Sequence, residues 1–442
     1  MASFLQWLRN LFSTGVQEVE KEVATGTKDI EREVAYLEME LRHWETRLKV
    51  AANQFAEKAG AEVYEATMQR LAELHQEAER LLTGRDEGDL SNLPWEFVHG
   101  YAVLHASDPN VKALPCHPKD FDTIVMKDGA LFGCHKWEKL DPGWIESLEK
   151  WFIHLLDRAD FVENPAVLPI GNQVTLGIAG DWGTGPFEAH APSIKVGRQL
   201  ATLNADYTIH LGDTYYAGTK IEENHAMKTW PQGSQGAFTL NSNHEMYSGA
   251  IGYYKLLEEF PKQQGTSYFA LYNDHWLIVG LDTAYASESR HLYMQGNLND
   301  AQIEWLGRLP KDRKVIVLSH HQPYDITGTQ QQPVYQQAAN ALGQDPAYWY
   351  WGHLHNGIWY HPLNDGKLQG RCVGHGAIPY GKARELDDYP EQIAWYETQL
   401  AGDPHYPDRV LNGFMSVELD GPHLREKMIG EDGSVRWSNS GS

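Results

Sequence analysis

The chain has few cysteines and few basic residues for its length. Only three of its 442 residues are cysteines, which is too few to hold a protein of this size together and is typical of a reducing compartment. Lys and Arg number 37 against 60 Asp and Glu, which gives a formal net charge of −23. Such a surface repels a phosphate backbone, so the charge argues against nucleic-acid binding.

Long apolar runs are also missing. No apolar stretch reaches the roughly 18 residues that a membrane-spanning helix needs, so the sequence predicts no transmembrane span. The first residues, MASFLQWLRNLF, have no basic segment ahead of an apolar core and no small-residue cleavage site, which argues against a secretory signal. We therefore expect a cytoplasmic protein.

Three regions are predicted along the chain. Hydrophobic residues make up 42% of the sequence, with 15 Trp and 22 Tyr, which is enough for packed cores. Residues 1–85 are predicted to be a helical region, residues 86–168 a small mixed region, and residues 169–442 an α/β domain. Within the middle region, Asp128 and Gly129 predict the turn of a hairpin, and a helix is expected through Trp144 and Leu155.

The helical region carries a heptad pattern with two apolar seams, the first running from Ile30 to Phe55. The second seam, from Tyr64 to Leu82, is offset from the first, and Gly60 near the join predicts a kink or an antiparallel hairpin. Such seams need a partner, which is either internal or a second copy of the chain, so we expect self-association through these helices as one outcome. The first coiled-coil seam consists of Ile30, Val34, Leu37, Leu41, Trp44, Leu48, Ala51 and Phe55.

The last region alternates short apolar runs with helical segments. The runs VTLGIAG, YTIHLG, HWLIVGLD and RKVIVLSH are rich in β-forming residues, and each is followed at once by polar residues. Strands with polar residues at their carboxyl ends are typical of an α/β enzyme. The segment FMSVELDGPHL predicts antiparallel strands near the end of the chain, so we expect two packed sheets.

Residues that bind metals follow five of the predicted strands. They offer oxygen and nitrogen donors and no thiolate, which suits ions such as Fe, Mn and Zn. Donors are sufficient for two ions if one carboxylate bridges them. The clusters are Asp181 in GDWG, Asp213 and Tyr216 in GDTYYAG, Asn243, His244 and Glu245 in SNHE, His320 and His321 in VLSHH, and His353 and His355 in GHLH. Glu245 could orient the His244 ring or be an ordinary solvated carboxylate.

These clusters, in this order over residues 173–360, resemble those of the calcineurin-like metallophosphoesterases. Most of that superfamily begins with Asp-x-His, whereas this chain has Asp181-Trp182-Gly183, and Tyr216 follows shortly after Asp213. In both departures the chain resembles the purple acid phosphatases. The resemblance implies an α/β fold, a two-sheet αββα metallophosphoesterase sandwich, here preceded by the helical N-terminal region.

The resemblance also implies a role for each donor, with one departure and one open choice. The departure is Ser242, which replaces the glycine that usually precedes Asn-His in the family. The spacing from Val317 favours His320 as the ligand, while the following Gln322-Pro323 leaves its neighbour His321 open. By the resemblance, the first metal is bound by Asp181, Asp213, Tyr216 and His355, and the second by Asp213 as the bridge, Asn243, His320 and His353, while His244 protonates the leaving group.

The donor types favour a particular chemistry. A phenol has a pKa of about 10, so Tyr216 as a ligand favours a strongly Lewis-acidic ion such as Fe(III), with a divalent Fe, Zn or Mn ion beside it. We expect an acid phosphatase that cleaves small-molecule phosphate monoesters with a metal-bound hydroxide, with Asp213 and His244 as catalytic residues.

Two alternatives stay open. One is a phosphodiesterase that uses the same metals on cyclic nucleotides or phospholipid head groups; the loops at 217–240 and 322–346 would separate it from a monoesterase. The other is an inactive coiled-coil scaffold, which the presence of every expected ligand argues against.

Overall fold

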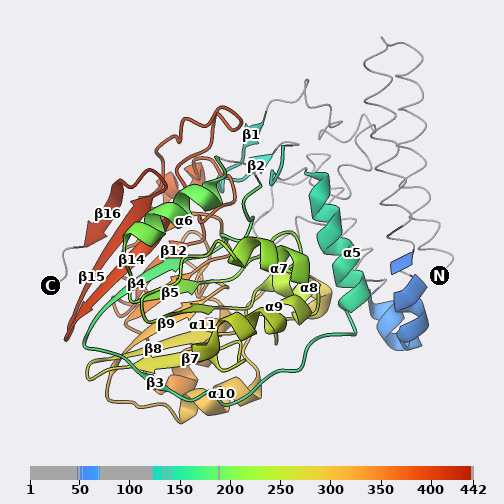
Figure 1. Ribbon diagram of the computed structural model, residues 1–442, viewed down its shortest axis with the longest axis horizontal. Helices are drawn as coiled ribbons and strands as arrows, with labels where there is room; N and C mark the ends of the chain where they lie inside the picture. Colours follow the sequence, from blue (N-terminus) through green and yellow to red (C-terminus); the bar gives the residue numbers. More distant parts are fainter. Residues whose placement is uncertain are drawn as a thin grey trace. The chain divides into compact units, whose positions relative to one another are not determined.

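The computed structural model describes residues 47, 50–51, 53–67, 69, 123–132, 135–138, 141–187 and 190–439 (Figure 1). Most of the predicted heptad seam lies outside these residues, so the coiled coil and the self-association through it stay predictions. The chain divides into two compact units, and the second combines Val125–Leu131, Arg158–Ser289 and Tyr293–Ser442. The first combines Met1–Ile124, Phe132–Asp157 and Arg290–Leu292.

The described part of the first unit is mainly helical. Residues 53–58 and 61–67 are helical, with an interruption at residues 59–60 where Gly60 predicted a break. The 3-10 turn η2 (Pro142–Trp144) leads into α5 (Ile145–His154), which is the predicted helix. The Phe55 ring packs edge-on against Phe152 of α5, with ring centroids 6.3 Å apart. The predicted turn at Asp128 and Gly129 lies between β1 (Ile124–Val125) and β2 (Leu131–Phe132).

The second unit contains two sheets. The larger has the strand order β13 (Ile393–Tyr396), β11 (Gly357–Tyr360), β12 (Gln369–Val373), β10 (Tyr348–Trp351), β9 (Lys314–Ser319), β8 (Trp276–Leu281), β7 (Phe269–Tyr272) and β3 (Leu168–Pro169). The smaller has the order β16 (Val435–Asn439), β15 (His423–Gly430), β14 (Gly413–Asp420), β4 (Gln173–Ala179), β5 (Tyr207–His210) and β6 (Gly236–Thr239).

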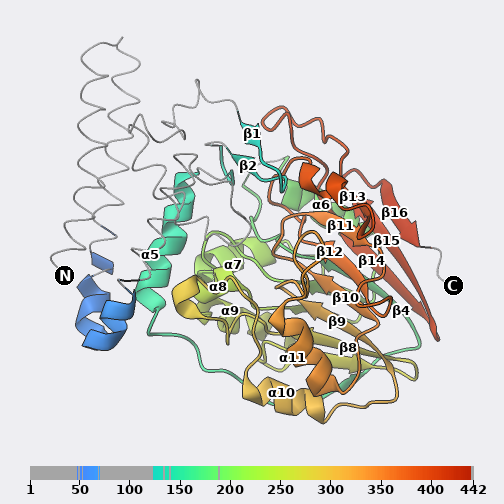
Figure 2. The same ribbon diagram turned by 180° about the vertical axis from the view of Figure 1, so that it is seen from behind.

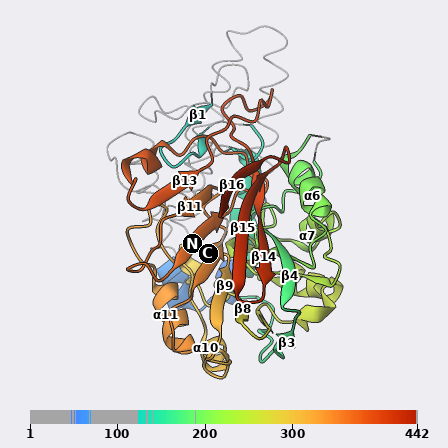
Figure 3. The same cartoon turned by 90° about the vertical axis from the view of Figure 1, so that its left-hand side faces the viewer.

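Both sheets have a parallel centre and antiparallel additions. Strands β4, β5 and β6 run parallel to one another, as do β8, β9, β10 and β12. Strand β14 pairs antiparallel with both β4 and β15, so the C-terminal hairpin extends a sheet that begins far earlier in the sequence (Figure 3). The predicted antiparallel character of the C-terminal strands is confirmed.

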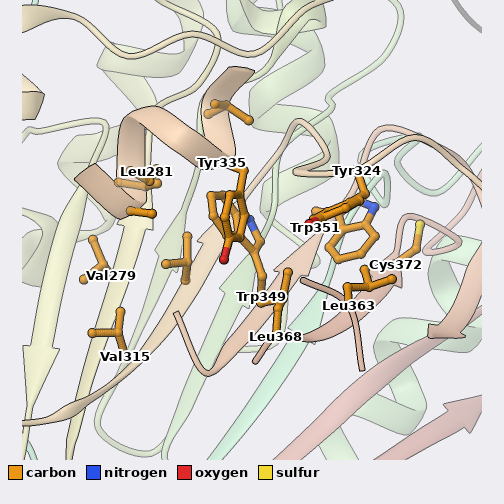
Figure 4. Packing of buried hydrophobic residues seen from close by; sticks show 14 of the residues in the cluster. Val279, Leu281, Val315, Tyr324, Tyr335, Trp349, Trp351, Leu363, Leu368 and Cys372 are labelled. Carbon is orange, nitrogen blue, oxygen red and sulfur yellow. The ribbon is translucent and has the colours of Figure 1, made fainter. Parts of the chain in front are cut away.

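Helices cover the outer faces of both sheets. Apolar residues of the two sheets meet in one core between them, which includes Ile178 and Ile209 of the smaller sheet and Ile316 of the larger. Helices α10 (Asp300–Gly307) and α11 (Pro333–Leu342) cover the larger sheet (Figure 2), where the Tyr335 ring of α11 stacks on Trp349 of β10 at 5.7 Å (Figure 4). Helix α6 (Pro192–Thr202) packs on the smaller sheet. The predicted two-sheet α/β sandwich is therefore confirmed.

None of the helices in the described part of the chain combines the length and the apolar character that a bilayer crossing requires.

The remaining helices connect the strands. These connecting elements are α7 (Lys220–Met227), α8 (Asn243–Tyr247), α9 (Ile251–Leu256), η3 (Leu257–Glu259), η4 (Pro261–Gln263), η5 (Ser289–His291) and η6 (Arg384–Asp388).

Candidate metal centre

Four of the predicted clusters follow neighbouring parallel strands. Asp181 and Asp213 come after β4 and β5, which pair with Ala179 opposite His210. His320 and His353 come after β9 and β10, which pair with Ser319 opposite Trp351. The carboxyl ends of parallel strands meet at one edge of a sheet, which is why clusters far apart in the sequence come together.

The two sheets are joined at this edge by a carboxylate. The main-chain N–H of His353 lies 2.8 Å from Oδ2 and 3.1 Å from Oδ1 of Asp181 and donates to this carboxylate. A Cβ on Gly352 would lie 2.5 Å from Asp181 Oδ2, so only a glycine lets the GHLH turn approach so closely. The first and the last predicted clusters are thus in direct contact.

The backbone at the centre is strained. Asp181, Asp213 and His353 have φ values of +55°, +76° and +67°, and His355 has +45°. Residues with a side chain rarely adopt this left-handed conformation, and it concentrates at functional sites because the surrounding structure must hold it in place. Four of the predicted ligands share it.

Asp181 and Asp213 are buried together, and their surroundings separate their pKa values. Burial, and then the neighbouring Asp213, raise the pKa of Asp181 to about 8. Burial would also raise the pKa of Asp213, but electrostatic interaction with the neighbouring His320 and His244 rings holds that pKa well below its usual range. Asp213 is therefore the carboxylate that the protein itself keeps ionised.

His320 presents an open ring nitrogen to the carboxylates. Its Nδ1 lies 3.0 Å from the carbonyl oxygen of Leu211, so we assign the ring proton to Nδ1 and leave the lone pair on Nε2. This Nε2 lies 3.0 Å from Asn243 Oδ1, 3.2 Å from His353 Nδ1 and 3.3 Å from Asp213 Oδ1. Atoms that accept hydrogen bonds thus converge on one point, and a histidine anchored through its other nitrogen is typical of a metal ligand.

His321 is held by protein groups on both sides of its ring. Its Nδ1 lies 2.8 Å from the Thr283 hydroxyl, and its Nε2 lies 2.8 Å from the carbonyl oxygen of Tyr293. His321 does lie close enough to His320 and His353 for the three to form one candidate cluster, and Asp181, Asp213 and His320 form another. The partners of His321 are not predicted ligands, whereas His320 Nε2 faces Asn243, His353 and Asp213, so this geometry favours His320 as the ligand.

The phenol among the carboxylates belongs to Tyr215. Its hydroxyl donates to Asp213 Oδ2 at 2.8 Å and lies 3.3 Å from Asp181 Oδ1. It also lies 2.9 Å from His355 Nε2. The sequence pattern assigns this position to Tyr216, whose carbonyl oxygen instead lies 2.6 Å from His244 Nδ1. The structure therefore brings the Tyr215 hydroxyl to the carboxylates, and the assignment of Tyr216 as a metal ligand stays a prediction.

His355 and His244 lie on the same side of the centre as the Tyr215 phenol. His355 Nε2 is 3.3 Å from Asp181 Oδ1 and 3.9 Å from Asp213 Oδ2. His244 Nε2 is 4.0 Å from Asp213 Oδ2. The His244 ring is flanked by the Tyr215 and Tyr247 rings, with centroids 4.6 and 4.9 Å away. These contacts hold the imidazole with Nε2 directed towards Asp213.

Two further residues of the SNHE cluster, Ser242 and Glu245, lie beside Asp213. The Ser242 hydroxyl makes hydrogen bonds with Asp213 Oδ1 and Glu245 Oε2. Burial, and then the charge of Asp213, raise the pKa of Glu245 to about 8. Glu245 is buried rather than solvated, and the sequence alone indicated no contact of either residue with Asp213.

Comparison with protein families agrees with this site. Residues 174–357 match the family model described as calcineurin-like phosphoesterase, and this stretch contains all five clusters. This part of the chain is therefore similar to calcineurin-like phosphoesterase domains. Together with its His and Asp cluster, it supports metal-dependent hydrolysis of phosphate esters. A search of the curated proteins returns no significant sequence match.

Several solved structures are similar to the chain. GAP50, described as the anchor in the inner membrane complex of Plasmodium, has a TM-score of 0.41 and 13% identity, covering 60% of this chain and 88% of its own. A predicted phosphoesterase from Streptococcus pneumoniae has a TM-score of 0.30 and 14% identity, covering 60% and 96%. Phosphopantetheinyl hydrolase from Mycobacterium tuberculosis has a TM-score of 0.27 and 12% identity, covering 54% and 99%.

Proposed function

We propose that the protein hydrolyses phosphate monoesters with a dinuclear metal centre of the purple acid phosphatase type. The observation that carries the proposal is the convergence of His320 Nε2 on Asp213 Oδ1 at 3.3 Å and Asn243 Oδ1 at 3.0 Å. Buried acceptor atoms in such an arrangement are stabilised by a cation between them. The calcineurin-like phosphoesterase match over residues 174–357 supports the same reading.

The donor set fits two ions. Asp213 offers one oxygen on the side of His320 and the other on the side of His355, so it is the natural bridge. One ion would be held by Asp181, Asp213, His355 and a tyrosine phenol, and the other by Asp213, Asn243, His320 and His353. A phenol ligand favours Fe(III) in the first position, and imidazole and amide donors suit a divalent Fe, Zn or Mn ion in the second. When bound, the two ions would acidify a water for attack on phosphorus and neutralise the phosphoryl oxygens.

His244 would supply the proton for the departing alcohol. Its Nδ1 lies 2.6 Å from the Tyr216 carbonyl oxygen, so Nδ1–H is held by the backbone. As an imidazolium, the ring would carry a second proton on Nε2, and this is the proton to be transferred. As the P–O bond of the ester breaks, the electron pair goes to the ester oxygen and the Nε2 proton is transferred to it. The ring is almost fully buried, with 4% of its side-chain surface exposed, so bulk water competes little for this proton.

The proposal is tested by metal analysis and hydrolysis on the same sample. The purified protein is assayed for metal content and visible absorption, and then given a nitrophenyl phosphate monoester and the corresponding diester. Two ions per chain including iron, a broad visible band and faster monoester turnover are expected. Colourless protein with two divalent ions and faster diester turnover would replace the proposal with a phosphodiesterase. Protein that binds no metal and cleaves neither ester would indicate a scaffold.

A further inference from the structure

Ser242 is a buried residue at the start of the SNHE cluster. It follows β6 and is the N-cap residue of α8, with its hydroxyl accepting the main-chain N–H of His244 at 3.1 Å. The residue is fully buried. A Cβ on Gly212 would lie 2.9 Å from the Ser242 Cβ, so the absence of a side chain at Gly212 makes room for Ser242.

The Ser242 hydroxyl does more than cap the helix. A cap needs only the contact with His244 N–H, yet the same oxygen also makes hydrogen bonds with Asp213 Oδ1 and Glu245 Oε2. A hydroxyl has one proton to donate and two lone pairs. Ser242 can therefore accept from the helix while it donates to a carboxylate. A glycine here would provide no donor to either acid.

The contact fixes the orientation of Asp213. Oδ1 is held by Ser242 and faces His320 Nε2 at 3.3 Å, while Oδ2 accepts the Tyr215 hydroxyl at 2.8 Å. A carboxylate held at both oxygens cannot rotate about its Cβ–Cγ bond without losing a partner. The proposed bridging ligand is thus aligned before any ion arrives, and prior alignment lowers the entropy cost of binding.

We propose that Ser242 is a positioning residue of the metal centre: its hydroxyl holds the Asp213 carboxylate in the orientation that binds metal and so increases the affinity for divalent cations. This inference rests on the proposed function, because it concerns the same site. It assigns to Ser242 a role that a glycine at this position cannot perform.

Two variants separate this role from helix capping. Gly is nearly as good an N-cap as Ser, whereas Ala costs about 1 kcal/mol of helix stability. Ser242→Gly and Ser242→Ala both remove the hydroxyl, so a positioning role predicts the same loss in both. A capping role predicts a loss in Ser242→Ala alone. Asn299→Ala is the matched control, because Asn299 caps α10 by accepting the Gln302 N–H and has no part in the proposed centre.

The experiment is a calorimetric titration of the metal-stripped full chain with Mn²⁺, which measures the binding affinity. Both Ser242 variants are expected to bind Mn²⁺ about 10- to 100-fold more weakly than the wild type, which is the usual effect of losing a partner of a metal ligand, and Asn299→Ala is expected to bind it like the wild type. Thermal unfolding in excess chelator shows that each variant is folded.

Three results would overturn the proposal, each in a different way. Wild-type affinity in Ser242→Gly with weaker binding in Ser242→Ala would mean that Ser242 is only a helix cap. Wild-type affinity in both variants would mean that the hydroxyl has no role in metal binding. A wild-type chain that binds no Mn²⁺ would instead contradict the proposed function, and the inference would fall with it.

Discussion

Tyr215 and Tyr216 are adjacent residues with the same side chain, and only the path of the backbone decides which phenol reaches the carboxylates. The resemblance to the purple acid phosphatases selects Tyr216 by its spacing from Asp213. In the structure the Tyr215 hydroxyl lies 2.8 Å from Asp213 Oδ2 and 2.9 Å from His355 Nε2. A one-residue difference of this kind depends on the turn after β5, which spacing alone does not describe.

The two tyrosines can be distinguished by colour. In iron-loaded protein, Tyr215→Phe is expected to abolish the visible charge-transfer band, because the phenol nearest the carboxylates would be missing. Tyr216→Phe, the matched control, is expected to retain the band. The measurement is the visible absorption spectrum at equal iron content. Loss of the band in Tyr216→Phe alone would restore the assignment made from the sequence pattern.

The acid role of His244 makes a prediction about leaving groups. His244→Ala is expected to retain its metal ions, since this residue is not among the proposed ligands. Turnover of alkyl phosphates should fall by about 10²- to 10⁴-fold, the usual contribution of a general acid, because an alkoxide needs a proton to depart. Turnover of nitrophenyl phosphate should fall much less, because nitrophenolate is a stable anion.

The comparison is made by measuring kcat for both esters in wild type and variant, with metal content determined on the same samples. An equal loss for the two esters would show that His244 does not protonate the leaving group. Loss of metal in the variant would place His244 among the ligands instead.

At the scale of strands and helices, apolar runs identified the central strands well. VTLGIAG contains most of β4, and RKVIVLSH contains β9. These strands are buried, so their residues are continuously apolar and β-branched. The edge strands β3 and β16 gave no comparable signal, since β3 has two residues and β16 is largely solvent-facing. Their pairing depends on contacts distant in sequence.

The choice between His320 and His321 shows what local pattern leaves open. Both follow β9 directly, and the sequence alone does not indicate which of the two histidines would bind a metal. The preference comes from partners on other elements, namely the carbonyl of Leu211 for one ring and Thr283 with Tyr293 for the other. Sequence could therefore predict the strand ends at which the candidate residues lie, whereas their side-chain partners required the fold.

At the scale of the second unit, the proposed centre draws its ligands from both sheets. Asp181 and Asp213 follow strands of the smaller sheet, and His320 and His353 follow strands of the larger. A bound ion would connect residues that separate when the sheets separate. Metal binding is therefore expected to stabilise the folded state as a whole.

Metal removal should accordingly lower the thermal midpoint. At free Mn²⁺ about 100 times its dissociation constant, binding adds about 2.7 kcal/mol to the free energy of unfolding, which raises the midpoint by several degrees in a domain of this size. The measurement is thermal unfolding with Mn²⁺ and with chelator. Asp213→Asn, which replaces the bridging carboxylate with an amide of the same shape, should unfold at one temperature under both conditions. A wild-type midpoint that does not respond to Mn²⁺ would contradict a centre shared by both sheets.

The short segment Val125–Leu131 belongs to the second unit, although the residues on both sides of it are assigned to the first. The carbonyl of Asp128 accepts a hydrogen bond from Asn356 Nδ2 at 3.1 Å, next to His355. A protease cut or a terminal deletion between residues 132 and 168 would therefore divide the polypeptide at a point that leaves Val125–Leu131 apart from the rest of the second unit. A fragment beginning after such a point would keep most of the two sheets and lack the Asp128 carbonyl that accepts from Asn356, next to the GHLH turn.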